Sequence, residues 1–198
     1  MPRLEFFTDY VCPWCYLCTL RLERLRAELD VDVVVRHFPL HPETPPAGQT
    51  LEQLFAGRNI DIPAAQARIR DLILAEGLPY GPRTMTYNSR LAQELAAWAS
   101  TQPGGWAIHM ALYQAYFVHN TNLAQVDALV EIAGQLGLPA GEARLVLDER
   151  RCRDDVDADW QRSHAMGITG VPAFLCGNQI LVGAQPYEQL AALVQSET

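Results

Sequence analysis

The stretch LEFFTDYVCPWC, residues 4–15, places a Cys-x-x-Cys pair directly after an apolar segment. Residues 4–9 are rich in aromatic side chains and have the length of a short β-strand. From Cys12 to Leu29, leucines recur at helical spacing, which predicts a helix that begins at the first cysteine. The β-branched run at residues 31–38 predicts a second strand. Such a β–α–β unit pairs its strands in parallel through a right-handed crossover, so the cysteines are expected at a strand-to-helix junction.

This position favours thiol chemistry. At a helix N-terminus the first backbone N–H groups are unpaired and the dipole end is positive, so a thiolate at Cys12 is stabilised. Cys15, one turn further along, can reach back and resolve a mixed disulfide. Pro13 suits a first helical turn, which needs no N–H from it. Two inert core cysteines, or half of a zinc site, are the weaker alternatives. Zinc would require a second pair of ligands, and outside residues 12–18 the sequence has no further Cys-x-x-Cys.

The other cysteines lie outside this pair. Cys18 extends the run to Cys12-x-x-Cys15-x-x-Cys18, which superficially resembles part of an iron–sulfur ligand set. The fourth cysteine of that pattern is absent, and on a regular helix the three thiols fan round the axis. Cys18 is therefore predicted to be a packing residue. Cys152 and Cys176 are expected to be two isolated thiols, and a second redox pair formed by them is the weaker alternative. The five histidines are predicted to lie at the surface, or in the core with their ring nitrogens hydrogen-bonded. They are His37, His41, His109, His119 and His164.

The middle of the chain is predicted to be helical. Prolines 39, 42, 45 and 46 break regular structure and mark a domain boundary. Between about residues 50 and 150 no convincing strand is expected. The expected helices are Leu51–Ala56, Pro63–Glu76, Ser89–Ser100, Trp106–Phe117 and Leu123–Leu136, the last capped by Asn122 and ended by Gly137.

The β pattern returns near the C-terminus. After a helix at about residues 155–166, strands are expected at residues 173–176 and 179–182. Gly177-Asn178 between them suits a type II′ hairpin turn. Pro186 opens a last helix that runs to Val194. The fold class is therefore α/β, a small mixed sheet with an all-helical inserted domain. Residues 1–42 and 151–198 form the sheet domain, and residues 43–150 form the insertion.

Composition excludes several classes of partner. The formal net charge of −8 argues against nucleic acid, because phosphate binding relies on clustered cations. Five arginines between residues 144 and 162 alternate with acidic residues, as expected of a solvated helix face. No run of about 18 apolar residues predicts a membrane span, and no secretory leader is visible. A cytoplasmic protein is expected, in a compartment that keeps bulk thiols reduced, which favours a catalytic pair over structural disulfides.

A second motif strengthens the redox interpretation. In TGVPAF, residues 169–174, a proline opens a strand after a glycine-bearing loop, where a cis Val171–Pro172 bond is plausible. With CPWCY at residues 12–16 and GAQP at residues 183–186, the chain resembles the DsbA family of thioredoxin-like proteins almost end to end. It is most similar to the FrnE-like branch, near the 2-hydroxychromene-2-carboxylate isomerases and kappa-class glutathione transferases. Cys18 departs from the glycine common in that family.

The resemblance implies roles for particular residues. Cys12 would be the attacking, more exposed thiol and Cys15 the buried, resolving one. Val171 and Pro172 would face them, with the Val171 backbone free to pair with an extended substrate. Pro13 and Trp14 would contribute to substrate binding, although an aromatic residue in a first turn is more often a packing residue. Asp9 would help to move protons at Cys15, a role as plausible as that of a turn or cap residue.

The leading hypothesis is thus a thiol–disulfide oxidoreductase that exchanges electrons with protein thiols or glutathione and needs no cofactor or metal. The second is a glutathione-dependent isomerase or transferase acting on an aromatic molecule. Isomerases of this group usually have serine where this chain has Cys12 and Cys15, which weighs against that chemistry. The third is a non-catalytic chaperone whose helical insertion binds clients. Substrate, direction of electron flow and oligomeric state, including a homodimer, stay open.

Overall fold

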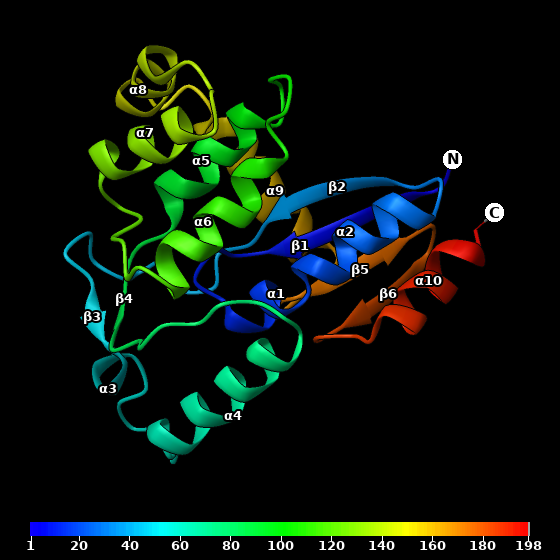
Figure 1. Ribbon diagram of the computed structural model, residues 1–198, viewed down its shortest axis with the longest axis horizontal. Helices are drawn as coiled ribbons and strands as arrows, with labels where there is room; N and C mark the ends of the chain where they lie inside the picture. Colours follow the sequence, from blue (N-terminus) through cyan, green and yellow to red (C-terminus); the bar gives the residue numbers. More distant parts are fainter. Residues whose placement is uncertain (198) are drawn as a thin grey trace.

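The computed structural model describes residues 1–197 (Figure 1). Its elements in chain order are β1 (Arg3–Thr8), α1 (Pro13–Leu17), α2 (Thr19–Glu28), β2 (Asp32–His37), β3 (Gln49–Thr50), α3 (Leu51–Leu54), α4 (Ile62–Ala75), β4 (Met85–Thr86), α5 (Arg90–Ala99), α6 (Ala107–Phe117), α7 (Val126–Gln135), α8 (Ala140–Asp148), α9 (Arg153–Ala165), β5 (Ala173–Cys176), β6 (Gln179–Val182) and α10 (Tyr187–Gln195). No helix within residues 1–197 is both long and apolar enough to cross a bilayer.

The central sheet has the strand order β2-β1-β5-β6. β1 and β2 are parallel, whereas β5 pairs antiparallel with both β1 and β6. Phe6 lies in register with Val35 on one side and with Phe174 on the other. The β5–β6 turn has φ +56° at Gly177, as the predicted type II′ turn requires. The mixed sheet and the hairpin expected from the sequence are confirmed.

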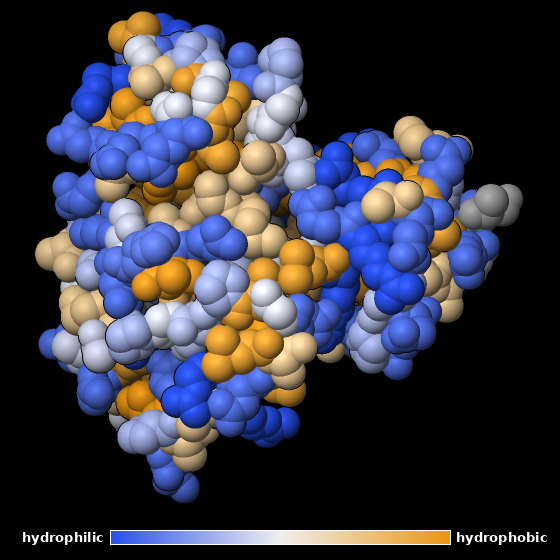
Figure 2. All heavy atoms as spheres, in the orientation of Figure 1, coloured by the Kyte–Doolittle hydropathy of each residue, from blue (hydrophilic) through white to orange (hydrophobic). Residues whose placement is uncertain are grey.

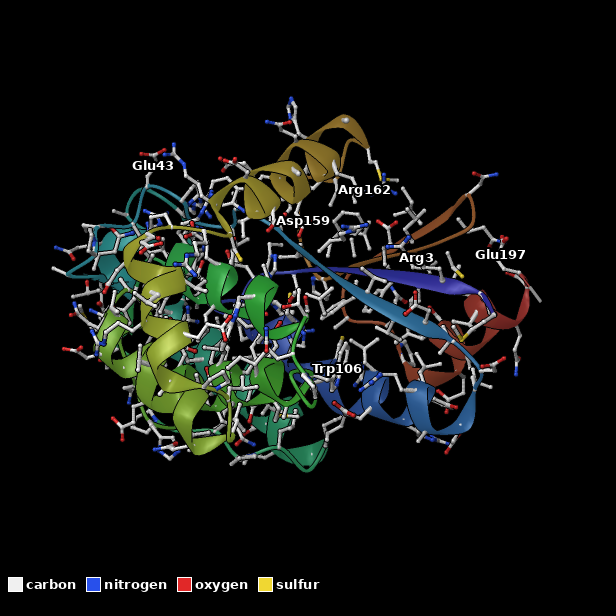
Figure 3. The ribbon with its side chains drawn as sticks, turned by 90° about the horizontal axis from the view of Figure 1, so that it is seen from above. Arg3, Glu43, Trp106, Asp159, Arg162 and Glu197 are labelled. Carbon is white, nitrogen blue, oxygen red and sulfur yellow. The ribbon has the colours of Figure 1, made fainter. Side chains whose placement is uncertain are left out.

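Helices cover both faces of this sheet (Figure 3). α9 lies on one face, and α2 and α10 lie on the other. Because side chains alternate along β1, Phe6 joins the larger core and Phe7 packs in a smaller cluster. Glu5 accepts two hydrogen bonds from Arg162 of α9, at 2.7 and 2.9 Å, which fixes that helix to the sheet.

The predicted helix from Cys12 to Leu29 is divided into α1 and α2 at Cys18. The Thr19 hydroxyl donates to the Tyr16 carbonyl at 2.8 Å, a local bond typical of threonine where a helix bends. The Leu22 N–H then bonds the Cys18 carbonyl and starts the second helix.

The insertion contains two features that the sequence did not predict. β3 and β4 form a sheet of two residues per strand, too short to produce a period in the sequence. α8 was not predicted. The expected cap of α7 was also wrong, since this helix begins at Val126. Asn122 instead accepts a bond from the Ala124 N–H and donates to the Pro46 carbonyl, which makes it a turn residue. Gly137, at φ +76°, ends the helix as predicted.

The insertion and the sheet share one core. The largest buried cluster runs from Leu4 of β1 through Cys15 to Tyr113 of α6 and Leu129 of α7. α1 contacts both α4 and α6, so the cysteine pair lies where the two parts of the chain meet. Figure 1 shows α4 below this junction and α5 and α6 above it. The domain limits at residues 42 and 150 stay predictions.

Candidate functional site

The cysteine pair opens α1. Cys12 is the N-cap residue and Pro13 takes the first helical position, as its missing N–H allows. The Cys12 N–H bonds the Asp9 carbonyl at 3.0 Å, and its own carbonyl accepts from the N–H groups of Cys15 and Tyr16. Main-chain hydrogen bonds therefore fix this turn without the help of side chains. Both thiols are free, so the structure shows the dithiol form.

Both cysteines of the motif are buried. Cys12 is 2% exposed and Cys15 is fully buried, so the predicted order holds but Cys12 is not an open thiol. Trp14, between them, is 38% exposed and is the member of the motif that solvent reaches most. A bulky disulfide can therefore contact the Cys12 sulfur only after the groups that cover it shift.

One of those groups comes from the loop before β5. The Cys12 Sγ donates to the Val171 carbonyl at 3.4 Å, across 159 positions of sequence. The Val171–Pro172 bond is cis, as predicted. The Pro172 carbonyl accepts from the Gly183 N–H at 2.7 Å, which attaches this loop to the end of the hairpin. The two motifs singled out in the sequence are thus brought together, with a main-chain acceptor at the sulfur.

Cys15 lies in a different electrostatic environment. Burial raises its pKa well above the ordinary value, and the neighbouring Cys12 raises it further. Two hydrogen bonds oppose this rise in the pKa because they favour the Cys15 thiolate. One comes from the Thr8 side chain and one from the Asp9 backbone. Cys15 is therefore protonated in the resting dithiol and must lose a proton before it can attack.

Asp9 is buried beside the motif, but its carboxylate contacts neither sulfur among the described hydrogen bonds. Oδ1 accepts from the Val11 N–H at 3.3 Å and Oδ2 from the Leu40 N–H at 3.0 Å. Burial raises the pKa of Asp9, while hydrogen bonds from Ser89 and from these amides oppose that shift. These contacts match the turn-residue interpretation, and its proton-relay role stays a prediction.

Sequence reasoning missed Arg83, from the loop before β4. Its Nη2 donates to the Val11 carbonyl at 3.4 Å, one residue before Cys12, and its Nε to the Tyr116 hydroxyl at 2.7 Å. The guanidinium also lies over the Phe117 ring, 5.5 Å from the centroid. Within residues 1–197 it has no carboxylate partner within ion-pair distance. No local signal could have found it, because it is 71 residues from Cys12 and in no motif.

The remaining cysteines are not gathered at the site. Burial raises the pKa of Cys18 to about 12, in keeping with a packing residue. Cys152 lies near Asp155 and Glu94, whereas Cys176 lies near Glu197 at the other end of the sheet. The structure therefore does not bring Cys152 and Cys176 together as a second redox pair.

His37 and His41 have the His-x3-His spacing found in some zinc sites. His37 is buried, and its Nδ1 lies 3.0 Å from Asp159 Oδ2. Burial, with Arg83 and Arg58 nearby, lowers the pKa of His41 to about 4. No group of three or more candidate metal ligands occurs in the described part of the chain.

The chain that carries α1 and the cis-proline loop has counterparts among known proteins. A model of the DSBA-like thioredoxin domain matches residues 3–195. The chain belongs to this family. Its DSBA-like domain covers both sheet segments and the helical insertion, as the sequence resemblance implied.

Individual relatives agree with this membership. The structure of a probable DsbA oxidoreductase from Streptomyces coelicolor has 30% identity and a TM-score of 0.90, covering 100% of this chain and 90% of that one. The uncharacterized protein YwbO of Bacillus subtilis is 25% identical, over 92% of this chain and 90% of its own. The cytosolic disulfide reductase DsbM of Pseudomonas aeruginosa (20%, TM-score 0.73, 98% of each chain) and a 2-hydroxychromene-2-carboxylate isomerase (15%, TM-score 0.75, 98% and 93%) share the fold.

Proposed function

We propose that this DSBA-like protein is a FrnE-type thiol–disulfide oxidoreductase that cycles Cys12 and Cys15 between dithiol and disulfide. The observation that carries this proposal is the free Cys12 thiol at the start of α1, facing the Val171 carbonyl, with a second free thiol one turn deeper. In such a pair the first thiolate opens a substrate disulfide, and the second closes the protein disulfide and releases the product. Pro13, Trp14, Val171 and Pro172 would line the substrate path.

The isomerase alternative keeps some support from the fold shared with the 2-hydroxychromene-2-carboxylate isomerase. Activation of bound glutathione needs a hydrogen-bond donor at the first motif position, not a redox pair. Cys15 has no part in that chemistry, yet it is fully buried beside Cys12, and a hydrogen bond from the Thr8 side chain favours its thiolate. This arrangement favours the oxidoreductase.

A redox titration tests the proposed function. In buffers of reduced and oxidised glutathione, the wild-type protein should pass reversibly between a form with five free thiols and a form with three. Peptide mapping should assign the lost pair to Cys12 and Cys15. The Cys12→Ser/Cys15→Ser variant should lose all exchange activity. A protein that stays reduced at every ratio, or a double variant that keeps full function, would favour the isomerase or the chaperone instead.

Protein thiols and glutathione are the proposed substrates, and a cytoplasmic location fits a thiol-dependent cycle. One related structure is described as cytosolic DsbM with GSH. In this chain the partly buried Arg83 offers a cation without a protein counter-ion close to Cys12. A partly buried cation of this kind favours an anionic partner, because burial without one is costly. Glutathione disulfide carries such carboxylates.

The Arg83→Gln variant should therefore discriminate less between disulfides. We expect its rate constant with glutathione disulfide to fall about fivefold relative to that with cystamine, which carries no carboxylate, since one partly exposed ion pair contributes up to about 1 kcal/mol. Stopped-flow measurements of protein oxidation with both disulfides give the ratio. Arg68→Gln is the matched control, because Arg68 is exposed on α4 and has no ion pair within the described residues. Equal ratios for wild type and Arg83→Gln would contradict the role of this arginine.

A further inference from the structure

We propose that the hydroxyls of Thr8 and Tyr113 relay the proton that Cys15 loses in the resolving step, through a small internal cavity to the carboxylate of Glu23. This inference rests on the proposed thiol–disulfide exchange. It makes Thr8 the first group to receive the proton, because the Thr8 hydroxyl is the side chain that favours the Cys15 thiolate, and it makes Tyr113 and Glu23 residues that act through Thr8.

A relay is needed because the proton of Cys15 is buried. Cys15 has no exposed surface, and its thiol must become a thiolate before it attacks. No solvent reaches the sulfur, so its proton has to pass to a protein group in contact with it. The nearest carboxylate in sequence, Asp9, accepts two backbone N–H groups and reaches Cys15 only through its main chain.

Thr8 and Tyr113 form the first links. Thr8 ends β1, and its side chain lies close enough to Cys15 for a hydrogen bond that lowers the pKa of that thiol. The same hydroxyl is bonded to the Tyr113 hydroxyl from α6, a contact between two buried groups. The Tyr113 ring is held against the rings of Tyr10, at 5.1 Å, and Tyr16, at 5.6 Å. Burial and the nearby Cys15 raise the pKa of Tyr113 well above its usual value, so it can pass a proton on but cannot keep the negative charge.

A cavity continues the path beyond Tyr113. It measures about 20 Å³, which is room for one water molecule, and its wall includes Thr8, Tyr113, Trp106 and Glu23. The Glu23 side chain is 43% exposed and accepts a hydrogen bond from Trp106 Nε1 at 2.5 Å. A single carboxylate thus borders both the cavity and the solvent, which suits the terminal proton acceptor.

His109 borders the same cavity but fits that role poorly. Its Nδ1 is bonded to the Tyr10 hydroxyl at 2.7 Å, and burial lowers its pKa to about 3. His109 and Trp106 also line a surface groove of about 760 Å³ beside β2. Figure 2 shows the molecule hollowed above the sheet on this side, and Figure 3 shows Trp106 from above, beside α2. The outer end of the path therefore lies close to open solvent.

The resolving step begins from the mixed disulfide and ends with the protein disulfide. In the mixed disulfide, Cys12 is bonded to the substrate sulfur. The Cys15 proton moves to Thr8, which passes its own proton to Tyr113, and Tyr113 passes one through the cavity to Glu23 and solvent. The Cys15 thiolate attacks the Cys12 sulfur, the bond between Cys12 and the substrate breaks, and the substrate leaves as a thiolate. The substrate disulfide is reduced by two electrons and the protein dithiol is oxidised.

A matched pair of variants tests the relay. Thr8→Val removes the hydroxyl at nearly constant volume, whereas Thr8→Ser keeps it and loses a methyl group. Single-turnover reactions with glutathione disulfide, quenched in acid and analysed by mass spectrometry, give the lifetime of the mixed disulfide. We expect Thr8→Val, Tyr113→Phe and Glu23→Gln each to lengthen that lifetime at least about tenfold, and Thr8→Ser to leave it near wild type, because one well-placed proton-transfer group contributes a factor of about 10²–10⁴.

Two controls separate a relay from structural damage. In a Cys15→Ser background the same changes should not slow formation of the mixed disulfide, which depends on Cys12 alone. Tyr10→Phe loses a comparable buried hydroxyl bond, to His109, and should leave the lifetime unchanged. Equal slowing by Thr8→Ser and Thr8→Val, or by Tyr10→Phe and Tyr113→Phe, overturns the relay, and an unaffected Glu23→Gln overturns its path. If Cys15→Ser forms no mixed disulfide, the proposed function itself fails.

Discussion

The Cys15→Ser variant is expected to accumulate a stable mixed disulfide through Cys12, whereas Cys12→Ser is expected to form none. In the wild type the mixed disulfide is opened by a thiol one helical turn away, and a well-oriented intramolecular group acts at an effective concentration far above that of millimolar external thiols. Without Cys15 the lifetime of the intermediate should rise by a factor of about 10³ or more. Incubation with glutathione disulfide, followed by intact-mass measurement, shows the adduct directly.

Cys18 provides the control for this prediction. It is fully buried three residues beyond Cys15, and its pKa is raised to about 12. A Cys15→Ser/Cys18→Ser variant should therefore trap the same adduct, at the same rate, as Cys15→Ser alone. Equal trapping by Cys12→Ser and Cys15→Ser would contradict the division into an attacking and a resolving thiol. An adduct mapped to Cys18 would show that the third thiol takes part in exchange.

A second large effect is expected on stability, at Glu94 of α5. This side chain is fully buried, and its carboxylate accepts from Arg90 at 2.7 Å and from two nitrogens of Arg150 at 2.6 and 2.7 Å. Arg90 also bonds Asp157 and the Arg153 carbonyl, so the cluster connects α5 to the start of α9. Glu94→Ala should lower the free energy of unfolding by about 3–5 kcal/mol, because it leaves two arginines without their shared partner.

The pH dependence of this effect has a definite sign. Burial alone would raise the pKa of Glu94, but the hydrogen bonds from Arg150 and Arg90 outweigh it and hold the pKa below 4.5. A carboxyl with a lowered pKa in the folded state contributes stability above its unfolded pKa, and this contribution is lost as the pH falls through the folded value. Urea unfolding should thus show the full difference between wild type and Glu94→Ala at pH 7 and a smaller one below pH 4.

An exposed ion pair supplies the comparison. Glu149 pairs with Arg151 at 2.7 Å, but both side chains are about half exposed, at 54% and 48%. Glu149→Ala should change the free energy of unfolding by less than about 1 kcal/mol. If Glu94→Ala were as mild as Glu149→Ala, the buried cluster would not be what holds α5 to α9.

The sequence by itself determined the local features of this protein. Leucine spacing predicts the helices, β-branched runs predict the strands, and Gly177 predicts the hairpin turn, because each depends on neighbours a few residues apart. The same local logic places Cys12 at a helix start and Cys15 one turn on. Distant similarity then supplied the link between the cysteines and Val171-Pro172, which periodicity alone does not contain.

Tertiary structure decided what depends on partners far apart in the chain. Burial of Cys12 by the loop at Val171, the approach of Arg83 to Val11 and the contact of Thr8 with Tyr113 join positions separated by 159, 72 and 105 residues. No sequence period encodes such contacts. The position of the Asp9 carboxylate also depends on the tertiary structure. Its position before the motif suggested a group at the sulfur, but the packed chain directs its carboxylate to backbone amides, because a buried acid is stabilised where it finds donors.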